Sequence, residues 1–371
     1  MKLIAIGPEL FMFHTAKEFI DEFKIGKDDL IVTIEVIYNQ YFKEAAKEAH
    51  VLFCDKYGST EPTDEMLDAI IQDASAIPYK RIIGIGGGAV MDMAKVVSVS
   101  DGMGIDAIFD KLPNLKRKAG LVLIPTTCGT GSEVTQLASI NRTRLGTKVG
   151  MGCPDMYADT SVLIPELLYG LPNYVFATSS IDALVHAVES VLSPNATPYT
   201  KLFGYQAIEM IIKGYQEVEK GGVEARNRIM GDFCIASNYA GISFGTAGCA
   251  AVHALSYQLG GKYHVPHGES NYAMFTGVLK NYAEIRTDGE LAVLNKKLTE
   301  LLGCPEDKVY DELEELLNKQ LPKKALHEYG VTEDDLPRFA RTVMETQERL
   351  MKNNFVPLDE ARVLKIFQEL Y

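Results

Sequence analysis

The chain has 371 residues, of which 47% are hydrophobic and 23% are charged, and its formal net charge is −13. It is long enough for two globular domains, and its acidity argues against a nucleic-acid partner or an anionic membrane surface. Six cysteines without Cys-x-x-Cys spacing, and a start that lacks the apolar length of a signal peptide, predict reduced thiols in a cytoplasmic protein.

Strand and helix patterns alternate over residues 1–164. Short β-rich runs are separated by stretches with helical periodicity, and such alternation predicts a parallel sheet covered by helices. We therefore expect an α/β domain in this part of the chain. The predicted strands are 29–33, 51–54, 81–85 and 121–124, and the predicted helices include 40–50 and 63–75.

A glycine-rich turn follows the third of these strands. The stretch 81–95 runs from an apolar strand through Gly86, Gly87 and Gly88 into a helix. Glycines let a backbone approach a pyrophosphate closely, and the free N–H groups at the helix start stabilise its charge. The match to Gly-x-Gly-x-x-Ala is loose and no convincing acidic residue follows about twenty positions on, so a purely structural glycine turn is the alternative.

A second polar glycine loop follows the next strand. The segment Pro125-Thr-Thr-Cys-Gly-Thr-Gly-Ser-Glu133 comes directly after the apolar run Leu121-Val-Leu-Ile124. Two such loops on neighbouring strand ends are harder to explain as chance turns than one. The pair predicts a dinucleotide-binding site in the α/β domain.

The pattern changes after residue 164. The later segments carry helical periodicity with acidic surfaces and few β-rich runs, so we expect residues 165–371 to form an all-α domain. Pro165 and Pro172 flank the crossing between the two domains. The predicted helices of this part are 176–194, 198–217, 225–244, 288–302, 306–318, 332–353 and 358–370.

Four residues of the second domain have the spacing of a metal site. Asp182 and His186 stand four apart in a predicted helix, so both side chains lie on one face. Between His253 and His267, a Gly-Gly break and a Pro-His turn can fold the second imidazole back toward the first. Imidazole plus one carboxylate suits Fe²⁺, Zn²⁺ or a similar ion. Taken singly, Asp182 is as well explained as a helix cap, and each histidine as a packed core residue.

Together these motifs resemble the iron-containing (group III) alcohol dehydrogenase family over nearly the whole chain. The family's Gly-Gly-Gly-Ser-x-x-Asp-x-x-Lys element is residues 86–95, with Ala89 in place of Ser, and its Pro-Thr-Thr-x-x-Thr-Gly-Ser-Glu loop is complete at 125–133. Its Asp-x-x-x-His-x-x-Glu helix is residues 182–189, and its Pro-His-Gly turn is 266–268. The resemblance implies one divalent metal ion, Fe²⁺ in preference to Zn²⁺, with the ligands Asp182, His186, His253 and His267.

The resemblance also implies a dinucleotide cofactor, with NAD preferred to NADP. Glu35, just after a predicted strand, is the acidic residue expected to bind the ribose hydroxyls, and no Lys or Arg occurs between Thr33 and Phe42. Lys148 is equally well explained as a surface lysine. The implied cofactor contacts are Gly86, Gly87, Gly88, Asp92, Thr126, Thr127, Thr130 and Lys148.

The sequence around the later histidines looks most like the 4-hydroxybutyrate dehydrogenase branch of the family. Many family members carry another His four residues after the third ligand, and here that position is Tyr257. This branch implies reversible hydride transfer between NAD and a primary alcohol, with 4-hydroxybutyrate oxidised to succinate semialdehyde. Tyr257 and His264 are candidates for catalytic or substrate-pocket roles, and each could instead be a packing residue.

Other functions remain open at this point. The first alternative is another short-chain alcohol or diol dehydrogenase of the same family. A lyase similar to dehydroquinate synthase shares the architecture, and a non-catalytic scaffold is a third alternative. The sequence leaves oligomeric state undecided, and a homo-oligomer is compatible with it.

Overall fold

The computed structural model describes residues 2–58, 61–145 and 147–371, and these form two compact units. One unit is Ile6–Leu171, and the other joins Pro172–Tyr371 to residues 2–5. The change of unit lies a few residues beyond the predicted boundary at residue 164, because a 3-10 turn, Pro165–Leu168, still belongs to the first unit.

The N-terminal residues belong to the helical unit rather than to the α/β domain in which the sequence prediction placed them. The backbone N–H of Ala5 donates to Thr246 Oγ1 at 3.2 Å. The hydroxyl of Thr197 donates to the carbonyl oxygen of Leu3 at 2.7 Å. Both partners lie about two hundred residues away in the sequence, so no local pattern could have predicted this attachment.

The first unit contains a six-stranded parallel sheet with the strand order β1-β8-β5-β4-β2-β3. The inner strands are apolar on both faces, as expected for a parallel sheet with helices on each side, whereas every residue of the edge strand β1 is exposed. Gly86 pairs with Pro125, so the two glycine loops begin side by side. The strands are β1 Glu9–Met12, β2 Asp29–Thr33, β3 His50–Phe53, β4 Arg81–Gly86, β5 Gly120–Pro125 and β8 Thr160–Leu163.

The helices of this unit agree with the predicted α/β pattern except at residues 40–50. There the chain has only the end of a π-helical turn, Tyr38–Phe42, followed by turns, because β3 pairs with β2 from His50 onward and the chain must turn back first. An antiparallel hairpin, β6 Leu137–Arg142 with β7 Thr147–Gly152, was not predicted either. The helices are α1 Ala16–Phe23, α2 Glu35–Ile37, α3 Asp64–Ser75, α4 Gly88–Ser100 and α5 Ile105–Lys111.

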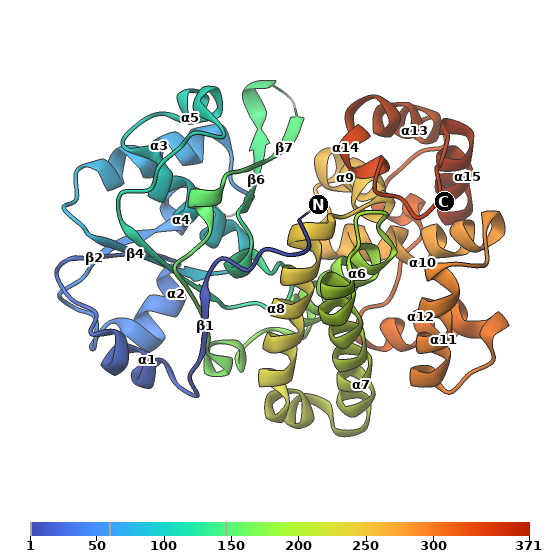
Figure 1. Cartoon of the computed structure of the whole chain (residues 1–371), viewed down its shortest axis with the longest axis horizontal. Coiled ribbons are helices and arrows are strands. Elements are labelled where there is room, and N and C mark those ends of the chain that lie inside the picture. The colour runs from blue at the N-terminus through green and yellow to red at the C-terminus, as the bar shows by residue number, and fades with distance from the viewer. Residues whose placement is uncertain (1, 59–60, 146) are drawn as a thin grey trace. The chain divides into compact units, whose positions relative to one another are not determined.

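The second unit is helical throughout, and its described residues contribute no named strand. At its centre lies α6, Asn173–Leu192, which packs against α7, α8 and α10 (Figure 1). The other long helices are α7 Pro198–Arg228, α8 Met230–Ala247, α9 Ala251–Tyr263, α10 His267–Ile285, α11 Glu290–Leu302, α12 Val309–Gln320, α13 Asp335–Thr346 and α15 Glu360–Leu370.

Helix α6 is apolar on almost every face. In the described part of the chain it is the one helix long and apolar enough to cross a membrane, and 89% of its most apolar stretch is buried inside the structure. Its buried residues include Asp182, His186 and Glu189. Burial by neighbouring helices explains the apolar composition, as for the core helix of any helical domain.

Candidate functional site

Helix α6 supplies the first two predicted metal ligands. Asp182 and His186 lie one turn apart, and their side chains are only 4% and 6% exposed. The Nδ1 atom of His186 is 3.9 Å from Asp182 Oδ2. Burial alone would raise the pKa of Asp182, but the imidazoles of His186, His267 and His253 lower it by more, so the carboxylate form is favoured.

Helices α9 and α10 supply the other two. His253 lies in the first turn of α9, and His267 is the first residue of α10. Their Nε2 atoms are 3.9 Å and 3.6 Å from Asp182 Oδ1. The chain reverses between the two helices at His264, whose φ of 56° is the left-handed conformation that ends α9.

A glycine permits the close contact between α10 and α6. A Cβ atom added at Gly268 would lie 2.0 Å from the carbonyl oxygen of Thr178, which is backbone and cannot move aside as a side chain can. The glycine of the Pro-His-Gly turn is therefore required by packing. It lets His267 approach the ligands on α6.

The four donor atoms lie within 4.8 Å of one another, which is the arrangement that a single metal ion requires. The residues fit a borderline divalent ion such as Fe²⁺ or Zn²⁺, because three imidazoles and one carboxylate converge and no thiolate is in the set. His267 has 28% of its side chain exposed, whereas the other three are buried. The cluster is therefore accessible on the side of His267.

Glu189 fixes the orientation of His253. Its carboxylate accepts hydrogen bonds from the backbone N–H groups of Ala250 at 3.0 Å and Val252 at 2.6 Å, at the start of α9. It also accepts from His253 Nδ1 at 2.6 Å. A proton held on Nδ1 leaves the lone pair on Nε2 for a metal ion. Sequence reasoning assigned Glu189 no role, although its place three residues after His186 put it on the ligand face.

Tyr257 and His264 lie near the cluster in different ways. Tyr257 stands one turn after His253 on α9, and its ring centroid is 6.2 Å from that of His267. The His264 side chain is exposed, and the role that the structure shows for this residue is its backbone conformation at the end of α9. Of the two, Tyr257 is therefore placed beside a predicted metal ligand, His267.

The two glycine loops lie against each other at the carboxyl ends of β4 and β5. The N–H of Thr126 donates to the carbonyl oxygen of Gly86 at 3.0 Å. A Cβ atom at Gly88 would lie 2.7 Å from Thr130 Cγ2, so this contact needs glycine. At Gly87, which precedes α4, the nearest atom would be Thr127 Cγ2 at 3.7 Å, so its backbone stays open. An anion can approach the N–H groups at the start of α4 there.

The Asp92 side chain is bonded within this unit. Its Oδ1 accepts from the Ser132 hydroxyl at 2.6 Å and its Oδ2 from the backbone N–H of Ser139 at 2.8 Å. Lys95 is fully buried and donates to Ser132 Oγ at 2.6 Å and to the carbonyl oxygen of Leu137 at 2.7 Å. Burial lowers the pKa of Lys95, and Asp92 and Glu133 oppose that shift. These contacts hold the second glycine loop in place.

The remaining predicted cofactor residues, Lys148 and Glu35, are not part of the glycine loops, although Glu35 follows β2, whose Thr33 pairs with Ile85 just before Gly86. Lys148 is in β7, and its Nζ pairs with Glu61 Oε1 at 2.6 Å. Glu35 begins α2 just beyond β2, and its backbone N–H donates to Asp55 Oδ2 at 2.7 Å. The structure thus gathers Gly86, Gly87, Gly88, Thr126, Thr127 and Thr130 at one place and sets Asp92 behind them.

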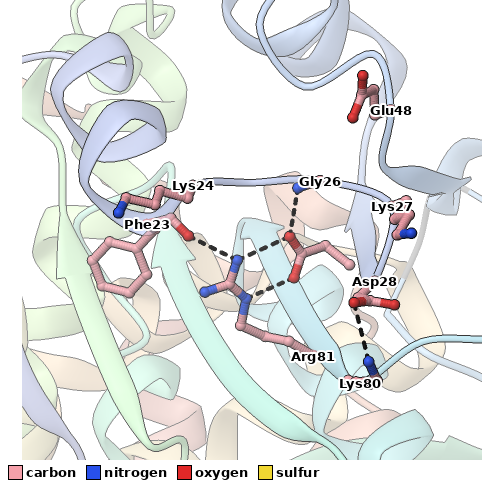
Figure 2. Close-up of a pocket in the computed structure, with 9 residues that line it drawn as sticks. Phe23, Lys24, Gly26, Lys27, Asp28, Glu48, Lys80 and Arg81 are labelled. Carbon is pink, nitrogen blue, oxygen red and sulfur yellow. Dashed lines mark hydrogen bonds and ion pairs between the residues drawn. The ribbon is translucent and has the colours of Figure 1, made fainter.

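A charged depression at the other edge of the sheet is a less suitable site. It surrounds the start of β2 and β4, whereas the glycine loops follow the carboxyl ends of β4 and β5. Arg81 donates to both carboxylate oxygens of Asp29 at 2.7 and 2.9 Å, and Lys80 pairs with Asp28 at 3.1 Å (Figure 2). These four charges are paired with one another, and Lys24, Lys27 and Glu48 also line the depression.

Comparison with known proteins agrees with this arrangement. The family model "Iron-containing alcohol dehydrogenase" matches residues 10–165, and "Fe-containing alcohol dehydrogenase family, C-terminal" matches residues 176–371. The 4-hydroxybutyrate dehydrogenase of Clostridium kluyveri is 45% identical over 372 residues and the whole length of both chains. The sulfoacetaldehyde reductase of Bilophila wadsworthia is 34% identical over 83% of this chain and 81% of its own length.

The fold has solved relatives as well. The sulfoacetaldehyde reductase of Bifidobacterium kashiwanohense in complex with NAD⁺ superposes with a TM-score of 0.82, at 21% identity, over 99% of this chain and 98% of that one. At this identity the likeness shows a shared fold. Both units of the chain have counterparts in that structure.

Proposed function

We propose that this chain, which belongs to the iron-containing alcohol dehydrogenase family, interconverts 4-hydroxybutyrate and succinate semialdehyde. It is an oxidoreductase that uses NAD and a divalent metal ion. The observation that carries the substrate is the 45% identity, over the whole of both chains, to a 4-hydroxybutyrate dehydrogenase. In the oxidation, the C–H bond of the alcohol carbon would break, and its hydrogen would leave with the bonding electron pair as a hydride that NAD⁺ would accept. The hydroxyl proton leaves, and a carbonyl group forms.

The proposed ligands are Asp182, His186, His253 and His267. A divalent ion held there supplies Lewis-acid polarisation of the alcohol or carbonyl oxygen and lowers the pKa of the alcohol. Around it, Glu189 keeps the proton of His253 on Nδ1, and the partly exposed side of His267 leaves access for a substrate. An accessible side is what distinguishes a catalytic metal site from a closed structural one.

The glycine loops are the proposed dinucleotide site. The backbone N–H groups at Gly87 and Gly88, at the start of α4, bind the pyrophosphate, and Asp92 and Lys95 hold the adjoining loop. Tyr257 is proposed to donate its phenolic proton to an oxygen of the substrate. A phenol does this without adding a second titrating imidazole beside the metal ligands.

Two basic residues, Lys262 and Arg142, are held in ion pairs with carboxylates of the protein rather than available to anchor the distal carboxylate of the substrate. Lys262 is paired with Asp335, whose side chain is 3% exposed. Arg142 is 8% exposed and is paired with Asp64 and Asp106. The carboxylate is therefore expected to be bound by other groups.

Steady-state kinetics on 4-hydroxybutyrate, butan-1-ol, glycerol and propane-1,2-diol test the substrate. We expect kcat/KM to be highest for 4-hydroxybutyrate. If butan-1-ol equals it, the carboxylate contributes no binding energy to the transition state, and the substrate assignment fails while the metal and NAD assignments stand.

We also propose that the protein acts in the cytoplasm on a small-molecule substrate, as a homo-oligomer and without a nucleic-acid or membrane partner. The edge strand β1 exposes Leu10, Phe11 and Met12, and an apolar sheet edge with unpaired backbone groups favours association with a second copy. Light scattering of the purified protein measures the oligomeric state. A monomer at micromolar concentration would contradict the oligomer.

A further inference from the structure

Asn271 lies among the proposed metal ligands although no sequence motif pointed to it. It stands one turn after His267 on α10, and it is fully buried. Its Nδ2 atom donates to Asp182 Oδ1 at 2.7 Å and is 3.2 Å from both His253 Nε2 and His267 Nε2. One amide nitrogen therefore contacts three of the four proposed donor residues.

The two ends of this carboxamide are in different situations. Nδ2 has only two hydrogens and is surrounded by three acceptors. Oδ1 is buried, and it has no hydrogen-bond partner among the residues that the structure describes. A native protein seldom leaves a buried carbonyl oxygen unbonded, so this oxygen indicates a missing positive partner.

A second buried asparagine on the same helix shows the usual arrangement. Asn281 Nδ2 donates to the carbonyl oxygen of Gly277 at 3.0 Å and to Glu369 Oε2 at 2.8 Å. Its Oδ1 accepts from Arg362 at 3.1 Å. Asn281 is thus bonded at both ends by the protein alone, whereas Asn271 is bonded at one.

The contacts of Nδ2 also conflict with a bound cation. A metal ion binds through the lone pairs of Asp182, His253 and His267, and these are the lone pairs to which the amide N–H groups point. An N–H hydrogen carries partial positive charge, so it and the ion cannot share them. Rotation of the carboxamide by half a turn exchanges Nδ2 for Oδ1 and removes this conflict.

We propose that Asn271 is a metal-responsive positioning residue. Its Nδ2 contacts three of the proposed donor residues, and with a divalent ion bound there the carboxamide would turn to present Oδ1 to the ion. The partial negative charge of Oδ1 would then stabilise the ion, in exchange for the hydrogen bond that Nδ2 donates to Asp182. This inference rests on the proposed ligand set, so the test also measures that set on its own.

The test is zinc affinity, measured by competition with a chromophoric chelator on the metal-free full-length protein. The unsubstituted protein is expected to bind one Zn²⁺ per chain. Asn271→Leu, which keeps the size but removes both polar ends, should raise the zinc Kd by about 10- to 100-fold, the usual effect of losing a group that supports metal ligands. Asn281→Leu is the matched control, and it should leave the zinc Kd unchanged even if it lowers stability.

A second variant covers the case in which Asn271→Leu does not fold. Asn271→Asp keeps the shape and presents only oxygen, so it suits the bound ion and loses the hydrogen bond to Asp182 in the metal-free protein. The difference in Tm between zinc-loaded and metal-free protein should therefore be larger than in the unsubstituted protein. The cobalt(II) absorption spectrum should change in both Asn271 variants and not in Asn281→Leu.

The outcomes distinguish an error in the proposed ligand set from an error in the role of Asn271. If the unsubstituted protein binds no zinc, the ligand set itself is wrong and the role of Asn271 is wrong with it. If it binds zinc and Asn271→Leu binds it with an equal or lower Kd, the ligand set stands and Asn271 has no supporting role. An unchanged or smaller Tm difference in Asn271→Asp would likewise overturn the proposal.

Discussion

The proposed metal site binds through side chains, whereas the proposed dinucleotide site binds through the backbone. At the metal centre side chains from three helices converge, and their donor atoms lie within 4.8 Å of one another. At the glycine loops Asp92, Lys95 and Ser132 are bonded to each other, and the backbone near Gly87 is what stays open. A substitution in the first site therefore removes a binding group directly. In the second site it acts by moving a loop.

The largest effect is expected from removal of a ligand side chain. His267→Ala should lower metal occupancy and turnover together, and kcat should fall by more than about 100-fold, because loss of a mere supporting partner already costs 10- to 100-fold. His327→Ala, an exposed histidine in a 3-10 turn, should change neither quantity. Metal analysis of both purified variants checks this. Full occupancy in His267→Ala would contradict the proposed ligand set.

Glu189→Gln tests whether metal affinity also depends on a side chain that is not a proposed ligand but bonds to one, His253. The amide can donate to His253 Nδ1, which would move the imidazole proton to Nε2 and take away the lone pair that binds the ion. We expect a zinc Kd about 10- to 100-fold higher. At the start of α9 the N–H of Val252 keeps its bond to the remaining oxygen, whereas the N–H of Ala250 shares its acceptor oxygen with His253 and loses it. A variant that binds zinc normally would mean that Glu189 serves only as a helix cap.

Local patterns predicted only part of this metal centre. Asp182 and His186 are one helical turn apart, so a period of 3.6 residues was enough to pair them. The role of Glu189 depends on His253, sixty-four residues away, and that of Asn271 on Asp182, eighty-nine residues away. Contacts of such long range depend on how α6, α9 and α10 pack. This packing cannot be predicted from local patterns in a single sequence. The attachment of residues 2–5 to the helical unit escaped prediction for the same reason.

At the glycine loops the sequence predicted position better than role. The strand-loop-helix pattern placed both loops at the carboxyl ends of neighbouring strands, and β4 and β5 do pair there. Asp92 was predicted as a cofactor contact on the basis of the family motif. The structure shows its two carboxylate oxygens bonded to Ser132 and Ser139, so a direct cofactor contact stays a prediction.

Lys95→Met should affect the second site without touching the first. It breaks a buried ion pair and two short hydrogen bonds, so we expect the free energy of unfolding to fall by about 3 kcal/mol. In the folded enzyme the looser loop should raise the KM for NAD while metal occupancy stays full. Chemical denaturation and cofactor titration measure the two effects. Lys56→Met, in an exposed ion pair with Asp73, is the control, and it should cost less than about 1 kcal/mol.

The smallest expected effect concerns the choice between NAD and NADP. It tests the difference between the two proposed sites, because here a side chain would act beside glycine loops that are proposed to bind through their backbone. Glu35 follows β2, and its backbone N–H is bonded to Asp55 Oδ2, so two carboxylates stand at this edge of the sheet. A carboxylate there attracts ribose hydroxyls and repels the 2′-phosphate of NADP. One charge pair at about 4 Å in water is worth ~1 kcal/mol, so Glu35→Gln should lower the ratio of kcat/KM for NAD over NADP by about fivefold. Asp55→Asn is the comparison variant. A larger change in that variant, with none in Glu35→Gln, would assign the discrimination to Asp55 and show that the Glu35 side chain points elsewhere.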